Sequence, residues 1–228
     1  MGMNNRVHSF MINGFPIEVA DIPQSMAPEI IACELNNDCY GLNRVDFTRG
    51  DVIIDIGAHI GMFAIYTALR FPQVVIHAFE PFPENFALLE QNLDRNGITS
   101  VRIHHQGVTS DGRLLEMVTN PQNSGSATCY SRAPEHERST GIPSTTLDHI
   151  FDSLSIDRCK FLKIDCEGSE YEILLSTRSL SKVEYLSGEF HHNQVLQSYG
   201  YTVEGLLKRC EGQIAPGKLS IQVTNISE

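Results

Sequence analysis

Short, nearly continuous apolar runs recur along the chain, separated by segments in which apolar residues follow a helical spacing. The runs are typical of strands buried on both faces of a parallel sheet, and they lie at 51–56, 74–79, 101–106, 159–165 and 183–190. Helices are predicted between and after them, at 61–70, 83–96, 145–154, 169–177, 192–198 and 203–210. This alternation predicts an α/β fold with a doubly wound, mostly parallel sheet. Such sheets bind ligands at the carboxyl ends of their strands.

The N-terminal part of the chain lacks a clean period. We expect residues 1–49 to form a leader or cap, with a strand near 15–20 and a helix near 28–35. The main domain is then predicted to span residues 50–228.

Three further segments stand outside the alternation. Residues 113–118 predict a short extra strand. Residues 119–145 are rich in small and polar types, and we expect a substrate-facing loop there. Residues 219–224 alternate weakly and are expected to form a terminal strand that joins the sheet antiparallel.

Composition narrows the class of protein. The chain has 17 Lys and Arg against 28 Asp and Glu residues, a formal net charge of −11, which argues against nucleic acid or an anionic membrane as the main partner. No apolar run approaches the roughly 18 residues of a membrane span, and no secretory signal is visible. The six cysteines form no C-x-x-C pair. We therefore expect a cytoplasmic protein with reduced thiols.

The first predicted strand ends in a glycine-containing turn formed by Asp55, Gly57, Ala58, His59 and Gly61. Glycines there let the backbone approach a ligand, and the next helix presents free N–H groups. The spacing is G-x-x-x-G rather than the dinucleotide pattern, and the acid before the first glycine would repel a pyrophosphate. These features favour the nucleoside of S-adenosylmethionine over NAD. The alternative is a plain strand–helix turn.

The next two strand ends offer the rest of a nucleoside pocket. Glu80 ends the second strand, where a carboxylate can accept hydrogen bonds from both ribose hydroxyls. Pro81 and Phe82 follow it and could cover the adenine face. Gly107 and Val108 end the third strand and would supply the far wall. A solvated glutamate and a simple turn are the plainer explanations.

The last two buried strands carry the candidate catalytic groups. Lys163 and Asp165 alternate with apolar residues and so share one face, and Asp165 stands at the carboxyl end. Glu189 and His191 share one side of the next strand. A carboxylate–histidine pair beside Asp165 could deprotonate a hydroxyl or an amine, or could hold a divalent metal. A hydrogen-bonded helix cap is the alternative.

Three acids bracket the start of the helix predicted at 169–177. Glu167, Glu170 and Glu172 are explained at least as well by capping and by the helix dipole as by catalysis. We therefore leave them out of the predicted catalytic set.

Taken together, four segments resemble the FkbM family of S-adenosylmethionine-dependent methyltransferases: Asp51–Gly61, Phe79–Pro81, Thr145–Asp148 and Leu162–Glu170. The resemblance covers roughly residues 30–205. It implies a Rossmann-like class I methyltransferase fold. It also implies S-adenosylmethionine as cofactor and, most often, O-methylation in natural-product or glycan tailoring.

The resemblance also bears on single residues. Glu189 and His191 match the acid and histidine usual in the family after the fifth strand, and Glu34 and Tyr40 match its leader more loosely. His59 departs from the pattern, since the family commonly has asparagine there. We expect a small-molecule acceptor and leave a homodimer open. The alternatives are an inactive methyltransferase-like binding protein and a nicotinamide oxidoreductase.

Overall fold

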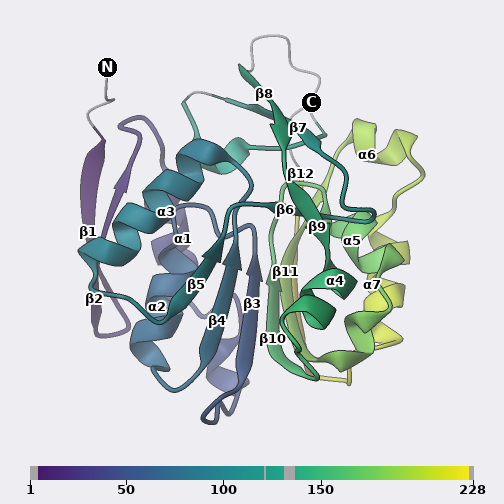
Figure 1. The fold of residues 1–228 in the computed structure, drawn as a ribbon, viewed down its shortest axis with the longest axis horizontal. Helices are drawn as coiled ribbons and strands as arrows, with labels where there is room; N and C mark the ends of the chain where they lie inside the picture. Colours follow the sequence, from purple (N-terminus) through teal and green to yellow (C-terminus); the bar gives the residue numbers. More distant parts are fainter. Residues whose placement is uncertain (1–4, 121, 131–136, 226–228) are drawn as a thin grey trace.

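A six-stranded, wholly parallel sheet forms the centre of the computed structural model, which describes residues 5–120, 122–130 and 137–225 (Figure 1). Its strands, in chain order, are β3 (Val52–Ile56), β4 (Val75–Phe79), β5 (Val101–His104), β10 (Cys159–Ile164), β11 (Val183–His192) and β12 (Leu219–Asn225). The strand order is β12-β11-β10-β3-β4-β5, and each neighbouring pair runs parallel. The predicted α/β fold is confirmed.

The terminal strand corrects one prediction. We expected it to be antiparallel, but β12 pairs in parallel with β11, with Gly188 opposite Ile221. The segment between the two strands carries helices α6 (Gln194–Ser198) and α7 (Val203–Glu211). A helical crossover returns the chain to the end of the sheet at which the preceding strand began, so the next strand runs parallel to it. A hairpin connection would instead give an antiparallel neighbour.

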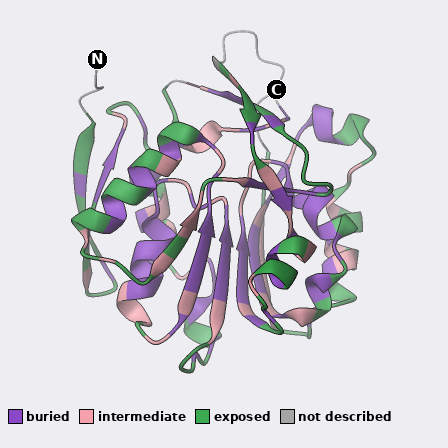
Figure 2. Cartoon of the chain, viewed as in Figure 1, coloured by how far each residue is buried: buried purple, intermediate pink, exposed green. Residues whose placement is uncertain are grey.

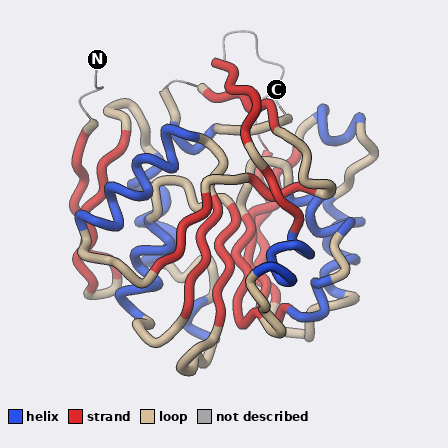
Figure 3. Tube along the Cα trace, in the orientation of Figure 1, coloured by secondary structure: helices blue, strands red, loops and turns tan. Residues whose placement is uncertain are grey.

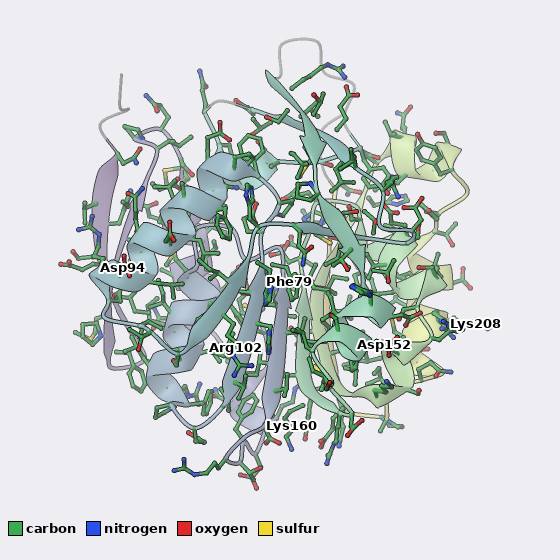
Figure 4. All side chains as sticks on the ribbon, in the orientation of Figure 1. Phe79, Asp94, Arg102, Asp152, Lys160 and Lys208 are labelled. Carbon is green, nitrogen blue, oxygen red and sulfur yellow. The ribbon has the colours of Figure 1, made fainter. Side chains whose placement is uncertain are left out.

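Helices cover both faces of the sheet (Figures 1 and 2). One face carries α1 (Ala27–Asn36), α2 (Met62–Arg70) and α3 (Pro83–Arg95), and the other carries α4 (Leu147–Ser153), α5 (Glu170–Ser176) and α7. Successive residues of β3 serve opposite faces, because Ile53 belongs to the core under α1–α3 and Ile54 to the core under α4, α5 and α7. Charged side chains such as Asp94, Lys160 and Lys208 lie at the periphery, while Phe79 lies centrally (Figure 4).

The chain reverses its strand order between β3 and β10. It moves outward from β3 through β4 to β5, and then returns to add β10, β11 and β12 on the other side of β3. The carboxyl ends of β3 and β10 therefore flank the topological switch point, where open α/β sheets bind ligands.

The leader is more regular than predicted. The expected strand and helix are present as β2 (Phe15–Asp21) and α1, but β2 also forms an antiparallel hairpin with β1 (Arg6–Ile12). The sequence pattern did not predict β1, because His8 occupies a buried position at which strand alternation would place an apolar residue. Its Nδ1 lies 3.0 Å from Glu29 Oε1. The domain boundary at residue 49 stays a prediction.

Between β5 and β10 the chain forms two small sheets (Figure 3). β6 (Gly107–Thr109) pairs with β9 (Ser144–Thr146), and β7 (Leu115–Thr119) pairs with β8 (Glu137–Ile142). β7 is the predicted extra strand. The segment predicted as a loop contains β8 and a 3₁₀ turn at Ser124–Ser126, so among the described residues it is more structured than its composition indicated. No helix in the described ranges is both long and apolar enough to cross a membrane.

Asn92 of α3 and Asn96, the residue that follows α3, hold the leader hairpin against the helices. Asn92 Oδ1 accepts from the Ala20 N–H at 2.7 Å, and its Nδ2 donates to the Ala20 carbonyl at 3.0 Å. Asn96, one helical turn later, makes the same pair of bonds with Glu18. Alternate residues of a strand present their backbone N–H and C=O groups to the same edge. The side-chain amides of Asn92 and Asn96 therefore make the hydrogen bonds that a neighbouring strand would otherwise make.

We expect Asn92→Ala to lower the free energy of unfolding by about 1–3 kcal/mol, because it leaves the buried polar groups of Ala20 unpaired. Urea denaturation measures the change. Gln91→Ala, at the exposed neighbouring position, is the control and should stay within about 0.5 kcal/mol of the parent. Equal stabilities for the two variants would contradict this role.

Candidate functional site

A cleft opens at the switch point, and we call it the switch-point cleft. Its empty space, including the part open to solvent, is about 1200 Å³. Its lining comes from helices α1 and α2, from the turn after β3 and from the carboxyl ends of β4 and β10.

Most residues predicted to bind a cofactor line this cleft: Gly57, Ala58, His59, Glu80, Pro81, Gly107 and Val108. Asp55, Gly61 and Phe82 are buried and lie outside the lining. Among the predicted catalytic residues, Asp165 and Glu189 line the cleft, and His191 is buried behind them.

In the turn after β3, the backbone of Gly57 lies directly against the backbone of Asp165 at the end of β10. Its φ is +79°, and a Cβ built on it would lie 1.8 Å from the backbone oxygen of Asp165. Its own carbonyl accepts a hydrogen bond from Lys163 Nζ at 2.6 Å. The turn and the end of β10 are thus in direct contact, which only glycine permits.

Lys163 holds the two strands of the switch point together. It lies opposite Asp55 in the register of β10 and β3, and its Nζ lies 3.2 Å from Asp55 Oδ1 and 3.6 Å from Asp165 Oδ2. Burial lowers the pKa of Lys163, but these two carboxylates outweigh it and raise the pKa above its usual value. Asp55 therefore neutralises the buried ammonium and does not itself face the cleft.

Glu80 joins the turns after β3 and β4. One carboxylate oxygen accepts from the N–H of His59 at 2.8 Å, and the other accepts from the N–H of Phe82 at 2.9 Å. Burial raises the pKa of Glu80 to about 7, although these two bonds oppose the shift. Each oxygen keeps a lone pair for a further donor, such as a hydroxyl group.

His59 belongs to a network that the sequence did not predict. Its φ is +53°, and its Nε2 lies 2.8 Å from Ser124 Oγ. The Ser124 hydroxyl donates to Asp21 Oδ2 at 2.7 Å, and Ser25 Oγ lies 3.0 Å from Ser124 Oγ. Burial lowers the pKa of His59 to about 4, so the ring is neutral at neutral pH. The network ties the leader to a segment bordering the cleft.

His191 lies among four carboxylates, and we call this group the His191 cluster: Asp165, Glu167, Glu170, Glu189 and His191. Its Nδ1 lies 3.0 Å from Glu170 Oε1. Its Nε2 lies 3.6 Å from Glu167, 3.9 Å from Asp165 and 4.0 Å from Glu189. Burial lowers the pKa of His191, but Glu170, Glu167 and Asp165 outweigh it and raise the pKa to about 10. The ring is therefore an imidazolium at neutral pH.

The acids at the start of α5 divide between two roles. Glu170 accepts from the N–H groups of Cys166 and Gly168, as a helix-start acid does, and also orients His191. Glu172 instead pairs with Arg113 at 2.7 Å and accepts from the hydroxyl of Tyr130. Glu172 therefore stabilises the segment before β7 and takes no part in the His191 cluster.

Glu167 is a functional candidate that our sequence analysis set aside. It lines the cleft and has a φ of +53°, a conformation that ordinary residues rarely adopt. Burial raises its pKa to about 8, against the opposing effect of His191. The sequence left Glu167 evenly divided between a capping and a functional role, whereas capping was the better explanation for the two acids that follow.

Side chains from α1, from α2 and from the segment after α1 also line the cleft. Tyr40 donates its hydroxyl to Glu34 Oε2 at 2.8 Å, and both residues line the cleft with Met62 and Phe63. Only the family resemblance pointed to Glu34 and Tyr40. Met62 and Phe63 had no signal, because apolar helix residues that line a cleft look like core residues in the sequence.

The donor set of the cluster is also suited to a divalent metal. Asp165, Glu167 and His191 each offer one ligand atom, and these atoms lie within 4.8 Å of one another. Oxygen and imidazole ligands suit several divalent ions, provided the imidazole loses its proton.

Comparison with known proteins decides the family. The model of the methyltransferase FkbM domain matches residues 55–210. The chain belongs to the FkbM methyltransferase family. The resemblance predicted from the sequence is thereby confirmed.

Curated relatives match parts of this FkbM-family chain. Methyltransferase 1 of Beauveria bassiana is 26% identical over 60% of this chain and 61% of its own. The 31-O-demethyl-FK506 methyltransferase of Streptomyces tacrolimicus is 37% identical over 36% of this chain and 32% of its own. A hexuronic acid methyltransferase of Haloferax volcanii is 28% identical over 62% of this chain and 56% of its own. The chain thus spans about three-fifths or less of the length of these relatives.

Among solved structures, an S-adenosylmethionine-dependent methyltransferase from Agrobacterium tumefaciens aligns with 100% of this chain and 54% of its own. The TM-score is 0.43 and the sequence identity 9%.

We expect Gly57→Ala to destabilise the protein more than Gly97→Ala. Both glycines have positive φ, which costs an alanine about 1–2 kcal/mol, but a Cβ at Gly97 meets no atom within 4 Å. The clash at Gly57 adds about 1–3 kcal/mol of overpacking. Urea denaturation of the two variants measures the difference. Equal losses would show that the turn can move away from β10.

Proposed function

We propose that this chain transfers a methyl group from S-adenosylmethionine to a hydroxyl group of a small molecule, natural product or glycan. The observation that carries the proposal is the switch-point cleft itself. A hydrogen-bonding carboxylate, Glu80, stands on one side, and the His191 cluster stands on the other. The cleft thus has one wall suited to a nucleoside and one suited to moving a proton.

The nucleoside wall supports a particular placement of the cofactor. The free lone pairs of Glu80 would accept hydrogen bonds from the ribose hydroxyls. Pro81, Gly107 and Val108 would border the adenine, and the turn at Gly57 would face the methionyl part. Bound there, the cofactor supplies a methyl group on a positively charged sulfur, which becomes a neutral thioether when the methyl leaves.

The opposite wall supports deprotonation of the acceptor. Transfer of the methyl group from a bound cofactor to the acceptor oxygen would leave the electron pair of the broken carbon–sulfur bond on sulfur, and the hydroxyl proton of the acceptor would need a base. We assign that proton to Glu167, because its pKa of about 8 is close to neutral pH. The imidazolium of His191 keeps its proton and, with Asp165 and Glu189, would orient the acceptor.

The curated relatives favour a hydroxyl acceptor. One is named for 31-O-demethyl-FK506 and another for a hexuronic acid. The acidic balance of the chain likewise supports a small molecule rather than nucleic acid. A cytoplasmic location and a homodimer remain proposals carried over from the sequence.

Isothermal titration with S-adenosylmethionine, S-adenosylhomocysteine and NAD tests the cofactor assignment. We expect micromolar binding of the first two and no heat from NAD. His191→Ala should lower turnover by about 10²-fold or more and leave cofactor affinity nearly unchanged. The control is His192→Ala, since the His192 ring contacts Gln197 and Tyr171, outside the His191 cluster.

The outcomes separate the alternatives. Heat from NAD alone would favour an oxidoreductase. Cofactor binding without transfer to any acceptor would favour a regulatory protein. Unchanged turnover in His191→Ala would remove His191 from the mechanism.

The pH profile tests the assignment of Glu167. Because only the ionised carboxylate accepts a proton, kcat/KM should be low below pH 8 and should rise with pH through about 8. Glu167→Gln should lower kcat by about 10²–10⁴-fold and abolish this limb. Formation of S-adenosylhomocysteine gives the rates. The control is the same profile after exhaustive chelation, because loss of activity there would reassign Asp165, Glu167 and His191 to a divalent metal.

A further inference from the structure

The segment between β7 and β8 contacts the turn after β3 through the buried side chain of Ser124. Its Oγ lies 2.8 Å from His59 Nε2, and its carbonyl accepts a hydrogen bond from Asn85 Nδ2 of α3 at 2.9 Å. The residues on either side of Ser124 line the switch-point cleft, as His59 itself does. The hydrogen bonds of Ser124 therefore bear on what His59 presents to a ligand.

The hydroxyl group of Ser124 uses all of its hydrogen-bonding capacity. It donates its one proton to Asp21 Oδ2 at 2.7 Å, which leaves two lone pairs for His59 Nε2 and for Ser25 Oγ, the latter at 3.0 Å. Asp21 is fully buried, and its other oxygen accepts from the N–H of Ile22 at 2.7 Å. Because a buried carboxylate oxygen without a donor is costly, the Ser124 proton stays with Asp21.

This arrangement fixes the position of the proton on the His59 ring. Burial lowers the pKa of His59 to about 4, so at neutral pH the ring carries a single N–H group. Since the Ser124 hydroxyl has no proton to spare, it bonds to His59 only by accepting, and Nε2 is the protonated nitrogen. Nδ1 is then an acceptor. No hydrogen bond joins Nδ1 to any residue within the described ranges, and the half-buried side chain lines the cleft.

The backbone of His59 places this acceptor relative to a bound nucleoside. Its N–H donates to Glu80 Oε2 at 2.8 Å, so His59 lies directly beside the carboxylate assigned to the ribose. In the placement proposed above, the turn after β3 faces the methionyl part of the cofactor. That part carries an ammonium group, whose N–H groups an unprotonated imidazole nitrogen can accept. A protonated Nδ1 would instead repel them.

We propose that Ser124 and Asp21 are positioning residues for cofactor recognition: they hold the His59 proton on Nε2, so that Nδ1 accepts a hydrogen bond from the ammonium group of the cofactor. The inference rests on the proposed methyltransferase function. It assigns a role in the cofactor site to the leader and to the segment between β7 and β8, neither of which belongs to the central sheet.

The test compares three thioethers of adenosine that share the nucleoside. S-adenosylhomocysteine carries an ammonium group and a carboxylate, 5′-(3-aminopropylthio)adenosine carries the ammonium group alone, and 5′-methylthioadenosine carries neither. Isothermal titration of the full chain at neutral pH measures the three affinities. ¹⁵N NMR of protein labelled at histidine reports which ring nitrogen of His59 is protonated, and His59→Asn identifies the signals of that ring.

Two variants change the hydrogen bonds of Ser124 in different ways. In Asp21→Asn the amide oxygen is retained by the Ile22 N–H, so the amide nitrogen faces Ser124 and donates to it. The Ser124 hydroxyl then donates to His59 Nε2, and the ring proton moves to Nδ1. Ser124→Ala removes the acceptor of the Nε2 proton altogether.

The controls make the same chemical changes at exposed positions. They are Asp94→Asn on α3 and Ser100→Ala before β5.

We expect the parent ring to be protonated on Nε2 and the Asp21→Asn ring on Nδ1. Both variants should bind S-adenosylhomocysteine and the aminopropyl thioether more weakly by about tenfold or more. Their affinity for 5′-methylthioadenosine should stay within about twofold of the parent value, which also shows that the cleft is intact. The controls should change none of the three affinities.

Three outcomes overturn the inference: a parent ring protonated on Nδ1, an Asp21→Asn variant with unchanged tautomer and affinities, or equal losses for all three thioethers. Equal losses would mean that Ser124 and Asp21 support the cleft as a whole. Failure of the parent chain to bind S-adenosylhomocysteine would instead overturn the proposed function.

Discussion

The buried ammonium of Lys163 is the interaction on which the site depends. It joins the two strands at the switch point, because its partners are Asp55 on β3, the carbonyl of Gly57 in the following turn, and Asp165 at the end of its own strand. A buried charge of this kind is tolerated only when its partners are in place. The turn, the strand pairing and the position of Asp165 are therefore fixed together, and the cleft lies directly beside them.

Burial gives the two walls of the cleft different chemistry. Beside the turn after β3 it leaves His59 neutral and raises the pKa of Glu80 to about 7. In the His191 cluster, surrounding carboxylates keep His191 charged, with a pKa of about 10. Similar side chains thus take different protonation states within one cleft. The carboxylate oxygens of Glu80 suit hydrogen bonds from hydroxyl groups, whereas a cluster of coupled charges suits proton transfer.

Parts of the chain distant in sequence build this environment. The leader contributes Asp21, which bonds to Ser124 and through it to His59, and also Glu34, which lines the cleft. Asn92 of α3 supports the leader strand that carries this network. The leader is accordingly part of the site as well as part of the core.

The sequence by itself determined the alternation of strands and helices, the glycine turn and the family. A strand buried on both faces must be apolar throughout, and a close backbone approach demands glycine at Gly57. It also placed Glu80 and Asp165 at strand ends. Only the tertiary structure decided that β12 is parallel, that β1 exists, and that Asp55 lies behind the cleft while Glu167 lies in it. The physical reason is that burial and pKa depend on partners from other elements, which local periodicity does not reveal. Ser124 and Asp21, for example, are hydrogen-bonded although they lie 103 residues apart in the sequence.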